Sequence, residues 1–530
     1  MESPRLTGSY YTSRQIAQYL TAWAVRGRDD RLLEPSFGDG VFLDAAAERF
    51  AQLGNTHPFI TGVELQSQVF ARYAQRAAAG FTGLCQDFME VSGGPFTAVV
   101  GNPPYVSLRN LDGASREKTL ARMAEYHVKM LNSGSLWMPF TVHSTQLLEP
   151  GGRLAFVLPF ELTYVKYAYP LWTFLGDHYG RLRLLRVHED FFPDVDVEAV
   201  LLLAEERGGC TDTVELEVYD SVDALLSATV AGRAHIEISD ILRREKPFTF
   251  ALLSEEQKRL LIALRAENTT VPLLDACKFN IGYVCADKEF FHPGPETVSR
   301  FALPEESLVP CVRSSRELSA GVGAYTDVRV QGSRLFFPEK LSPADRAYIQ
   351  YGEETGVNLR YKCRRRKPWY LTPDVMRPDL ILTVFGDAPK LIVNRGGCAV
   401  SNSLLAGTIT GDVTPEQVLC MWYNSLTLLS IERNVHALGG GVLVLIPGET
   451  DLLEVVRPIP AEAAAAIAAR LDACLREEGL EAAYRLGDEL VLSRQLGVTD
   501  EQIEQIRAAA ATLKSWRVPK YRSKRARAYP

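Results

Sequence analysis

The sequence predicts a protein of two parts, an α/β first half and a second half in which short strands are mixed with helices. From residue 31 onward, strand-like apolar runs alternate with helical patterns, which is typical of βαβ units. Glycines follow the first of these strands, where a nucleotide-binding unit needs a tight turn next to its ligand. From Lys278 onward, short strand-like runs are broken by glycine and proline.

Length and composition set broad limits on this protein. A chain of 530 residues is long for one domain, so two or three are expected. Its 46% hydrophobic and 23% charged residues are ordinary for a soluble protein. With no apolar run of membrane-spanning length and no signal-peptide core, we expect a cytoplasmic protein. Nine cysteines without any Cys-x-x-Cys pair argue against a disulfide framework and against a zinc site.

The distribution of charge favours an anionic partner more than its sum does. A net charge of −7 alone disfavours nucleic acid. However, a basic cluster occupies residues 362–367, and no acidic residue follows Glu504. Helical patterns cover residues 461–475, 481–490 and 500–513. The tail from Trp516 to Arg527 is expected to be flexible, either neutralising DNA phosphates or only improving solubility.

The stretch from Thr97 to Tyr105 is the most informative in the chain. An apolar strand ends in Asn102-Pro103-Pro104-Tyr105. Proline fixes its own φ and keeps the residue before it extended, so this turn cannot continue into a helix. It offers two acceptors, the Asn102 side-chain oxygen and the Pro103 carbonyl, which match the two hydrogens of an NH2 group. Tyr105 could stack on the ring that bears this amine. The simpler alternative is a stiff surface turn.

Acidic residues end each of the first three predicted strands. The first is followed by Glu34-Pro35-Ser36-Phe37-Gly38-Asp39-Gly40. This acid-lined glycine loop would repel a pyrophosphate and fits a cationic or hydroxyl-rich ligand. Glu64 is placed to accept from ribose hydroxyls, and Asp87 with Phe88 matches the amine and the ring face of an adenine. Singly, such acids are more often solvated charges at strand ends.

Together these motifs resemble those of class I S-adenosylmethionine-dependent amino methyltransferases. The most similar group is the gamma-type DNA adenine methyltransferases of bacterial restriction-modification and related defence systems. The resemblance implies a Rossmann-like class I methyltransferase domain with a mixed, mostly parallel sheet, and S-adenosyl-L-methionine as cofactor. Ser13 departs from the family, where many members have proline. By motif position, the cofactor-binding residues would be Tyr11, Thr12, Glu34, Pro35, Gly38, Gly40, Glu64, Asp87, Phe88 and Asn102.

The same resemblance implies a target base. Phe191-Phe192-Pro193-Asp194 follows a predicted strand, and the aromatic before this proline stacks on the extruded base in relatives. The expected reaction is direct methyl transfer to the N6 amine of an adenine flipped out of double-stranded DNA. Asn102 favours adenine, because relatives that act on cytosine usually have serine there. The implied catalytic residues are Asn102, Pro103, Pro104, Tyr105 and Phe192.

The resemblance also predicts the domain organisation. We expect a catalytic domain over residues 1–245, an α+β target-recognition domain over 246–460, and a helical segment with a basic tail over 461–530. The expected partners are double-stranded DNA and, where one exists, a separate cognate restriction endonuclease, with no metal and no membrane. The predicted DNA-contacting residues are Arg364, Arg365, Arg366, Lys367, Trp369, Tyr370, Arg395, Lys520 and Arg522.

Two alternatives stay open at this point. The first is a methyltransferase for another planar amine or amide, such as the cytosine amine, an RNA base or a protein glutamine, because enzymes on such substrates share Asn-Pro-Pro-Tyr. The second is a modification subunit that is active only with partner subunits.

Overall fold

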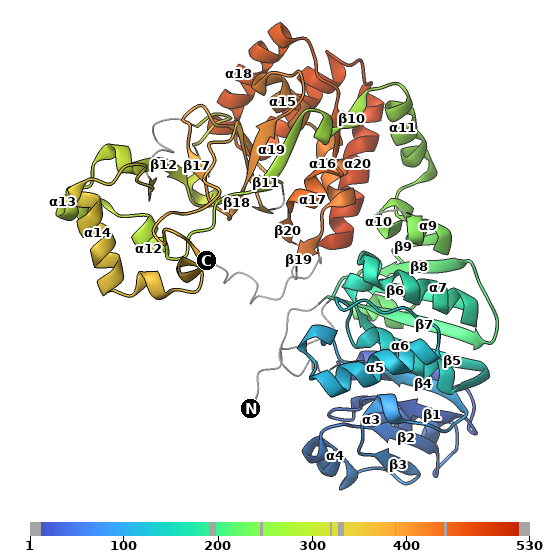
Figure 1. Cartoon of the computed structure of the whole chain (residues 1–530). Coiled ribbons are helices and arrows are strands. Elements are labelled where there is room, and N and C mark those ends of the chain that lie inside the picture. Colours follow the sequence, from blue (N-terminus) through green and yellow to red (C-terminus); the bar gives the residue numbers. More distant parts are fainter. Residues whose placement is uncertain are drawn as a thin grey trace. The chain divides into compact units, whose positions relative to one another are not determined.

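The computed structural model describes residues 12–189, 198–243, 247–318, 321–326, 333–386, 388–438 and 442–518. The chain divides into two compact units, residues 1–252 with 515–530, and residues 253–514 (Figure 1). The first division therefore falls after residue 252, whereas the sequence placed it after 245. Residues 461–514 group with the second unit instead of forming a segment of their own.

The first unit is built on a nine-stranded sheet. Its strands are β1 (Arg31–Glu34), β2 (Phe59–Val63), β3 (Phe81–Leu84), β4 (Phe96–Gly101), β5 (Leu148–Pro159), β6 (Tyr179–Val187), β7 (Ala199–Arg207), β8 (Thr213–Tyr219) and β9 (Gly232–Glu237). Their order is β3-β2-β1-β4-β5-β7-β6-β8-β9. β1 to β5 pair in parallel, whereas β7 is antiparallel to both β5 and β6. The carboxyl ends of β1 to β5 therefore share one edge.

Helices cover both faces of this sheet, as an apolar, mostly parallel sheet requires (Figure 1). One face is covered by α5 (Gly113–Glu125), α6 (Trp137–Leu147) and α7 (Tyr169–His178). The opposite face is covered by α2 (Arg14–Ala24), α3 (Val41–Gln52), α4 (Ser67–Ala74) and α8 (Val222–Leu226). Two short helices, α9 (Ile238–Arg243) and α10 (Pro247–Ala251), extend the first of these layers.

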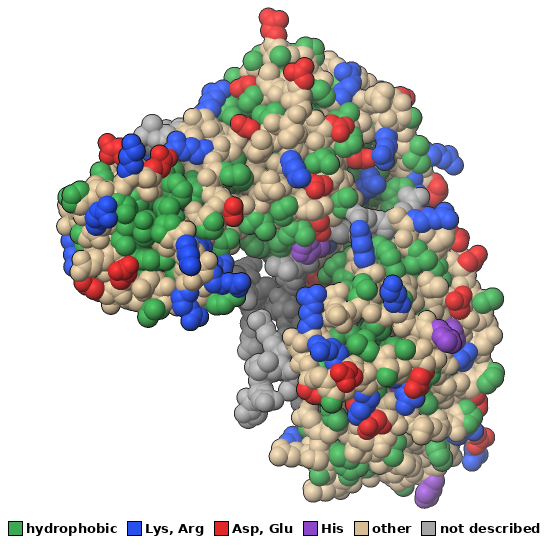
Figure 2. Space-filling view, viewed as in Figure 1, with side chains coloured by type: hydrophobic (Ala, Val, Ile, Leu, Met, Phe, Trp, Pro, Cys, Tyr) green, Lys and Arg blue, Asp and Glu red, His purple; other side chains and the backbone are tan. Residues whose placement is uncertain are grey.

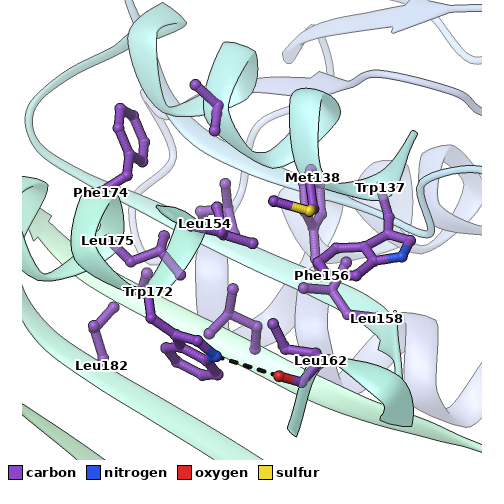
Figure 3. Packing of buried hydrophobic residues seen from close by; sticks show 14 of the residues in the cluster. Trp137, Met138, Leu154, Phe156, Leu158, Leu162, Trp172, Phe174, Leu175 and Leu182 are labelled. Carbon is purple, nitrogen blue, oxygen red and sulfur yellow. Dashed lines mark hydrogen bonds between the residues drawn. The ribbon is translucent and has the colours of Figure 1, made fainter. Parts of the chain in front are cut away.

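β5 illustrates how the sheet supports two cores. Leu154, Phe156 and Leu158 belong to the hydrophobic cluster on one face, and Ala155 and Val157 to the cluster on the other. This is the two-residue alternation of a strand that is buried on both faces. Figure 3 shows the first cluster, where the indole Nε1 of Trp172 donates a hydrogen bond of 3.2 Å to the Leu162 carbonyl.

The second unit contains several small sheets and a set of helices, as its broken strand pattern predicted. The largest sheet has four strands, β11 (Cys277–Ile281), β18 (Leu404–Ile409), β14 (Leu380–Thr383) and β16 (Leu391–Val393), all paired antiparallel in that order. The others are β13 (Ser333–Phe336), β12 (Leu308–Val312) and β17 (Ala399–Val400); β15 (Phe385–Gly386), β20 (Val442–Val444) and β19 (Ala437–Leu438); and β10 (Thr270–Pro272) with β21 (Glu454–Val456).

Three helices of the second unit, α18, α19 and α20, begin within one residue of the predicted starts at 461, 481 and 500. Ser254 caps α11 with a reciprocal pair of hydrogen bonds to Gln257. The helices are α11 (Glu255–Ala266), α12 (Lys288–Phe291), α13 (Pro295–Phe301), α14 (Pro343–Glu354), α15 (Pro415–Trp422), α16 (Ser425–Asn434), α17 (Pro447–Thr450), α18 (Ala461–Glu477), α19 (Leu480–Gly487) and α20 (Asp500–Arg517).

The prediction that a flexible tail begins at Trp516 is wrong. This residue lies in the last turn of α20, is 3% exposed and belongs to a hydrophobic cluster of the first unit. Its ring lies 5.5 Å from that of Phe160 and 5.9 Å from the guanidinium carbon of Arg186. Burial of this large aromatic side chain stabilises the end of α20, which extends past the predicted end at residue 513.

Candidate active site

Four of the predicted site residues lie at one edge of the sheet. Glu34 ends β1, Glu64 follows β2, Asp87 comes soon after β3, and Asn102 follows β4. These strands are neighbours in the order β3-β2-β1-β4 and run parallel. Because parallel strands end on the same side, the structure brings these side chains to one edge, where α/β proteins bind their ligands.

Glu64 holds the glycine loop in place. One of its carboxylate oxygens accepts from the Gly38 amide at 3.0 Å and the other from the Gln66 amide at 2.8 Å. The Phe37 amide donates to the Val63 carbonyl at 3.0 Å, so the loop is also tied to β2 by backbone. A carboxylate has about four acceptor positions, so these two bonds leave capacity for ribose hydroxyls.

Glu34 is the most strongly perturbed acid at this edge. Its side chain is buried, and its Oε2 makes no hydrogen bond to any residue that the structure describes. Burial, together with the carboxylates of Asp39, Glu64 and Asp44, raises the pKa of Glu34 well above its usual range. A buried acceptor without a partner fits a ligand that brings a positive charge, such as the ammonium group of S-adenosyl-L-methionine.

Asn102 is joined to the start of the described chain. Its Nδ2 donates to Thr12 Oγ1 at 3.3 Å, and its carbonyl accepts from Ser36 Oγ at 3.4 Å. Thr12 is buried next to Ser13, which precedes α2 but makes no side-chain cap bond. Thr12, which was predicted to hold the cofactor, therefore orients the amide of the Asn-Pro-Pro-Tyr motif in this structure.

The rest of this motif lies at the boundary between the two cores. Pro103 is buried, whereas Pro104 and Tyr105 are half-buried. Pro35 of the glycine loop is also buried. The Tyr105 side chain packs against the hydrophobic clusters on both faces of the sheet. Tyr11 and Phe192 lie outside the described residues.

Asp87 and Phe88 are placed differently from each other. Asp87 accepts from the Met89 amide at 3.0 Å and lies 3.4 Å from Lys118 Nζ of α5. Phe88 is only 2% exposed, with its ring centroid 4.9 Å from that of Phe140 and 4.8 Å from that of His143. The ring that was expected to lie against the cofactor adenine is therefore a core residue in this structure.

Leu65 is an apolar side chain at this edge that the sequence analysis missed. It follows Glu64 directly and is 69% exposed. If Glu64 accepts from ribose hydroxyls as predicted, an exposed apolar side chain next to it would contact the attached base. The signal in the sequence was the position of this leucine, directly after an acid at a strand end and before the polar start of a helix.

Gly40 provides a test of how tightly the loop is built. Its φ is +87°, and a Cβ there would lie 2.2 Å from Cε2 of Tyr73. We expect Gly40→Ala to cost about 2–4 kcal/mol of unfolding free energy, from the left-handed backbone and the clash. Gly38→Ala is the matched control, because its φ is +53° and nothing lies within 4 Å; about 1–2 kcal/mol is expected. Urea unfolding of both variants measures the difference, and equal losses would contradict the clash.

Glu34 provides a pH test. A raised native pKa means that the folded protein holds this proton more tightly than the unfolded chain does. The stability from the protonated form is complete below the ordinary value of 4.5 and is lost as pH rises through the native pKa. Because glutamine does not titrate, we expect Glu34→Gln to raise Tm at pH 8 and to flatten the fall in Tm between pH 5 and 9. Parallel Tm curves for the two proteins would contradict the raised pKa.

The predicted DNA-contacting residues of the second unit fall into two groups. Arg364, Arg365 and Lys367 are exposed and Tyr370 is half-buried. Arg366 instead donates to the Val284 carbonyl at 2.6 Å, and Trp369 donates to Glu353 at 3.0 Å. These two side chains support the local structure of the unit.

Arg395 is also engaged within the second unit. Its guanidinium carbon lies 3.5 Å from the ring centroid of Tyr325, and it pairs with Glu416 at 3.0 Å. Lys520 and Arg522 lie outside the described residues. In the described part of the chain, no helix is long and apolar enough to cross a bilayer. The same residues contain no group of three or more His, Cys, Asp or Glu placed to hold a metal ion.

The sheet order and the chemistry at its edge define a class I S-adenosylmethionine-dependent methyltransferase fold, and S-adenosyl-L-methionine is the expected cofactor. Two family models match the chain. The Eco57I restriction-modification methylase model matches residues 64–188, and the model of the C-terminal domain of the type II methyltransferase M.Eco57I matches residues 245–492. The chain is thus a relative of the DNA methyltransferases of restriction-modification systems.

Individual proteins extend this comparison. The chain is 22% identical over 407 residues to the type II methyltransferase M.AccI of Acinetobacter calcoaceticus, covering 73% of this chain and 72% of that protein. It is 23% identical over 457 residues to M.BstVI of Geobacillus stearothermophilus, covering 74% and 78%. Among solved structures, the type IIL restriction-modification enzyme MmeI in complex with DNA aligns with a TM-score of 0.59 at 13% identity, over 95% of this chain and 75% of that one. The alignment with the type IIG restriction endonuclease BpuSI covers 66% of that chain, with a TM-score of 0.43 and 13% identity.

Proposed function

We propose that this chain transfers a methyl group from S-adenosyl-L-methionine to the N6 amine of adenine in double-stranded DNA. The observation on which the proposal rests is the position of Asn102, at the end of β4 and beside the buried acid that ends β1. The edge thus combines acceptors for an amine with acids for a cationic, hydroxyl-bearing cofactor. The relatives named above include two type II methyltransferases and a restriction-modification enzyme in complex with DNA, and Asn rather than Ser at this position favours adenine over cytosine.

In this proposal the acids hold the cofactor and the Asn-Pro-Pro-Tyr motif holds the target. Glu34 faces the ammonium group, Glu64 the ribose hydroxyls, and Asp87 the adenine amine of the cofactor. Lys118 pairs with Asp87 in this structure, so Lys118 and the adenine amine of the cofactor would have to share that carboxylate. The bound cofactor supplies an electrophilic methyl group on a sulfonium centre.

The target amine is activated by hydrogen bonds that it donates. Its lone pair is delocalised into the ring, which makes it a poor nucleophile. The Asn102 side-chain oxygen and the Pro103 carbonyl accept its two hydrogens, which favours a tetrahedral nitrogen with an available lone pair. These bonds strengthen as positive charge develops on nitrogen, so they stabilise the transition state more than the ground state. The nitrogen then loses one proton to solvent.

The target base has to leave the duplex to reach this edge. Extruding it costs a few kcal/mol, part of which stacking on Tyr105 would recover. We assign methyl transfer to the first unit and DNA recognition to the second. A separate restriction endonuclease of the same specificity is the proposed functional partner.

The nucleoside product tests this function. Purified protein is incubated with methyl-free DNA and labelled cofactor, the DNA is digested to nucleosides, and Asn102→Ala serves as the control. We expect N6-methyladenine from the wild type and far less from the variant. N4-methylcytosine would change the base assignment. Cofactor binding without any transfer to DNA would contradict the substrate, and would direct the search to a partner subunit or to another amine.

A further inference from the structure

A short segment of the second unit presents two large apolar side chains to solvent. Leu359 is 68% exposed and Tyr361 is 64% exposed. They lie in the turns just after α14, where two short 3-10 helices cover Val357–Leu359 and Cys363–Arg365. Val357 and Cys363 are buried in the hydrophobic cluster of this part of the unit. The exposed side chains therefore belong to a segment that is anchored on both sides, which we call the basic tip (residues 359–367).

The basic tip is surrounded by positive charge. No acidic residue occurs between Glu354 and Asp374, whereas Arg360, Lys362, Arg364, Arg365, Arg366 and Lys367 all fall in this interval. Figure 2 shows Lys and Arg side chains gathered on the side of the second unit that lies below α14 in Figure 1. Like charges that lie close together repel one another, so binding of an anionic partner would relieve this repulsion.

The cations of the tip have two different roles. Arg360 pairs with Asp287 at 3.0 Å, and Arg366 is turned inward to the Val284 carbonyl. Lys362, Arg364 and Lys367 are exposed and make no ion pair with any residue that the structure describes. Three cations are thus available to an anionic partner, while two arginines stabilise the segment.

Tyr361 is itself held in place. Arg365 donates from Nη1 to the Tyr361 hydroxyl at 2.6 Å, and its guanidinium carbon lies 5.5 Å from the centroid of the Tyr361 ring. Since both groups are exposed, this contact orients the ring without burying it. An aromatic side chain that is already oriented loses less conformational entropy when a ligand covers it.

We propose that the basic tip is a DNA-contacting element. Leu359 and Tyr361 make apolar contacts within a groove of the DNA duplex, while Lys362, Arg364 and Lys367 bind its phosphates. This inference rests on the proposed function and adds residues to it, because the sequence had indicated only the cations and the pair Trp369 and Tyr370. Phosphates alone would require charge but no exposed leucine. Apolar side chains beside cations match a duplex, whose charged backbones flank sugars and bases.

The salt dependence of binding separates the two kinds of contact. Phosphate contacts release counterions, so the logarithm of the association constant falls with the logarithm of salt concentration, by about 0.9 per contact. Apolar contacts leave this slope unchanged. We therefore expect Leu359→Ala/Tyr361→Ala to lower affinity about tenfold or more at every salt concentration, with the wild-type slope. Lys362→Gln/Arg364→Gln should reduce the slope by about 2.

The experiment measures binding of the full chain to a fluorescent DNA duplex by anisotropy, from 50 to 400 mM salt. Ile262→Ala is the matched control, because Ile262 is an equally exposed apolar residue of the same unit (63%) on α11. It should bind as the wild type does. Circular dichroism verifies that each variant is folded.

Three results would overturn the proposal. Wild-type affinity in the Leu359→Ala/Tyr361→Ala variant, from a protein that still methylates DNA, would refute the tip and leave the proposed function intact. A change in sedimentation without a change in DNA affinity would identify a protein interface instead. A wild-type protein that binds cofactor but neither binds nor methylates DNA would refute both proposals.

Discussion

Asn102→Ala is expected to lower kcat for methyl transfer by about 10²–10³-fold, the loss typical when one group that stabilises transition-state charge is removed. The variant lacks the side-chain acceptor for the target amine, and the Pro103 carbonyl alone cannot accept both hydrogens. The affinity for S-adenosyl-L-methionine should change much less. Single-turnover transfer of labelled methyl groups gives the rate, and calorimetry gives the cofactor Kd.

Thr12→Val is a graded control for this prediction. Valine keeps the shape of threonine but removes the hydroxyl that accepts from Asn102 Nδ2. The amide would keep its acceptor and lose part of its orientation, so a loss of about 1 kcal/mol, or roughly 5-fold in rate, is expected. An Asn102→Ala variant with a near wild-type rate would show that this side chain does not bind the amine. An equal loss in cofactor affinity would assign it to the cofactor.

The sequence was sufficient to predict the edge of the sheet on which the proposed mechanism depends. Glu34, Glu64, Asp87 and Asn102 each follow an apolar run, and strands that alternate with helices are parallel. Their carboxyl ends must then meet, whatever the details of packing. The proline pair fixes the backbone after Asn102 locally, so no tertiary information was needed for that turn either.

Tertiary packing decided what the sequence could not. Phe88 follows a strand-end acid as a cofactor-stacking ring would, yet Phe140 and His143 of α6 enclose it. Trp516 stands at the start of a basic tail, yet it is buried against Phe160. In both cases the partner is distant in sequence, and local patterns contain no information about which helix covers which ring.

The same limit applies to the second unit. A run of arginines next to Trp369 predicts a nucleic-acid surface, but composition does not distinguish side chains that point inward from those in solvent. Arg366 and Trp369 donate hydrogen bonds to Val284 and Glu353, respectively. Leu359 and Tyr361, which the sequence pattern did not mark as DNA-contacting, are exposed.

Trp172→Ala is expected to have the largest effect on stability, about 3–5 kcal/mol of unfolding free energy. Trp172 is fully buried in α7, with its ring centroid 5.5 Å from that of Phe248. Truncation would leave a cavity in the cluster of Figure 3 and deprive the Leu162 carbonyl of its donor. The total free energy of unfolding of a domain is typically about 5–15 kcal/mol, so the first unit would become only marginally stable.

Urea unfolding followed by circular dichroism measures this loss, provided that the transition of the first unit is identified. Addition of S-adenosyl-L-methionine serves that purpose, because a ligand shifts only the transition of the unit that binds it. Trp172→Phe separates the two contributions. Phenylalanine keeps most of the ring packing and removes the indole donor, so a smaller loss of about 1–3 kcal/mol is expected. If alanine cost no more than phenylalanine at this position, the packing of Trp172 against Phe248 would contribute little, and the hydrogen bond to Leu162 would account for the effect.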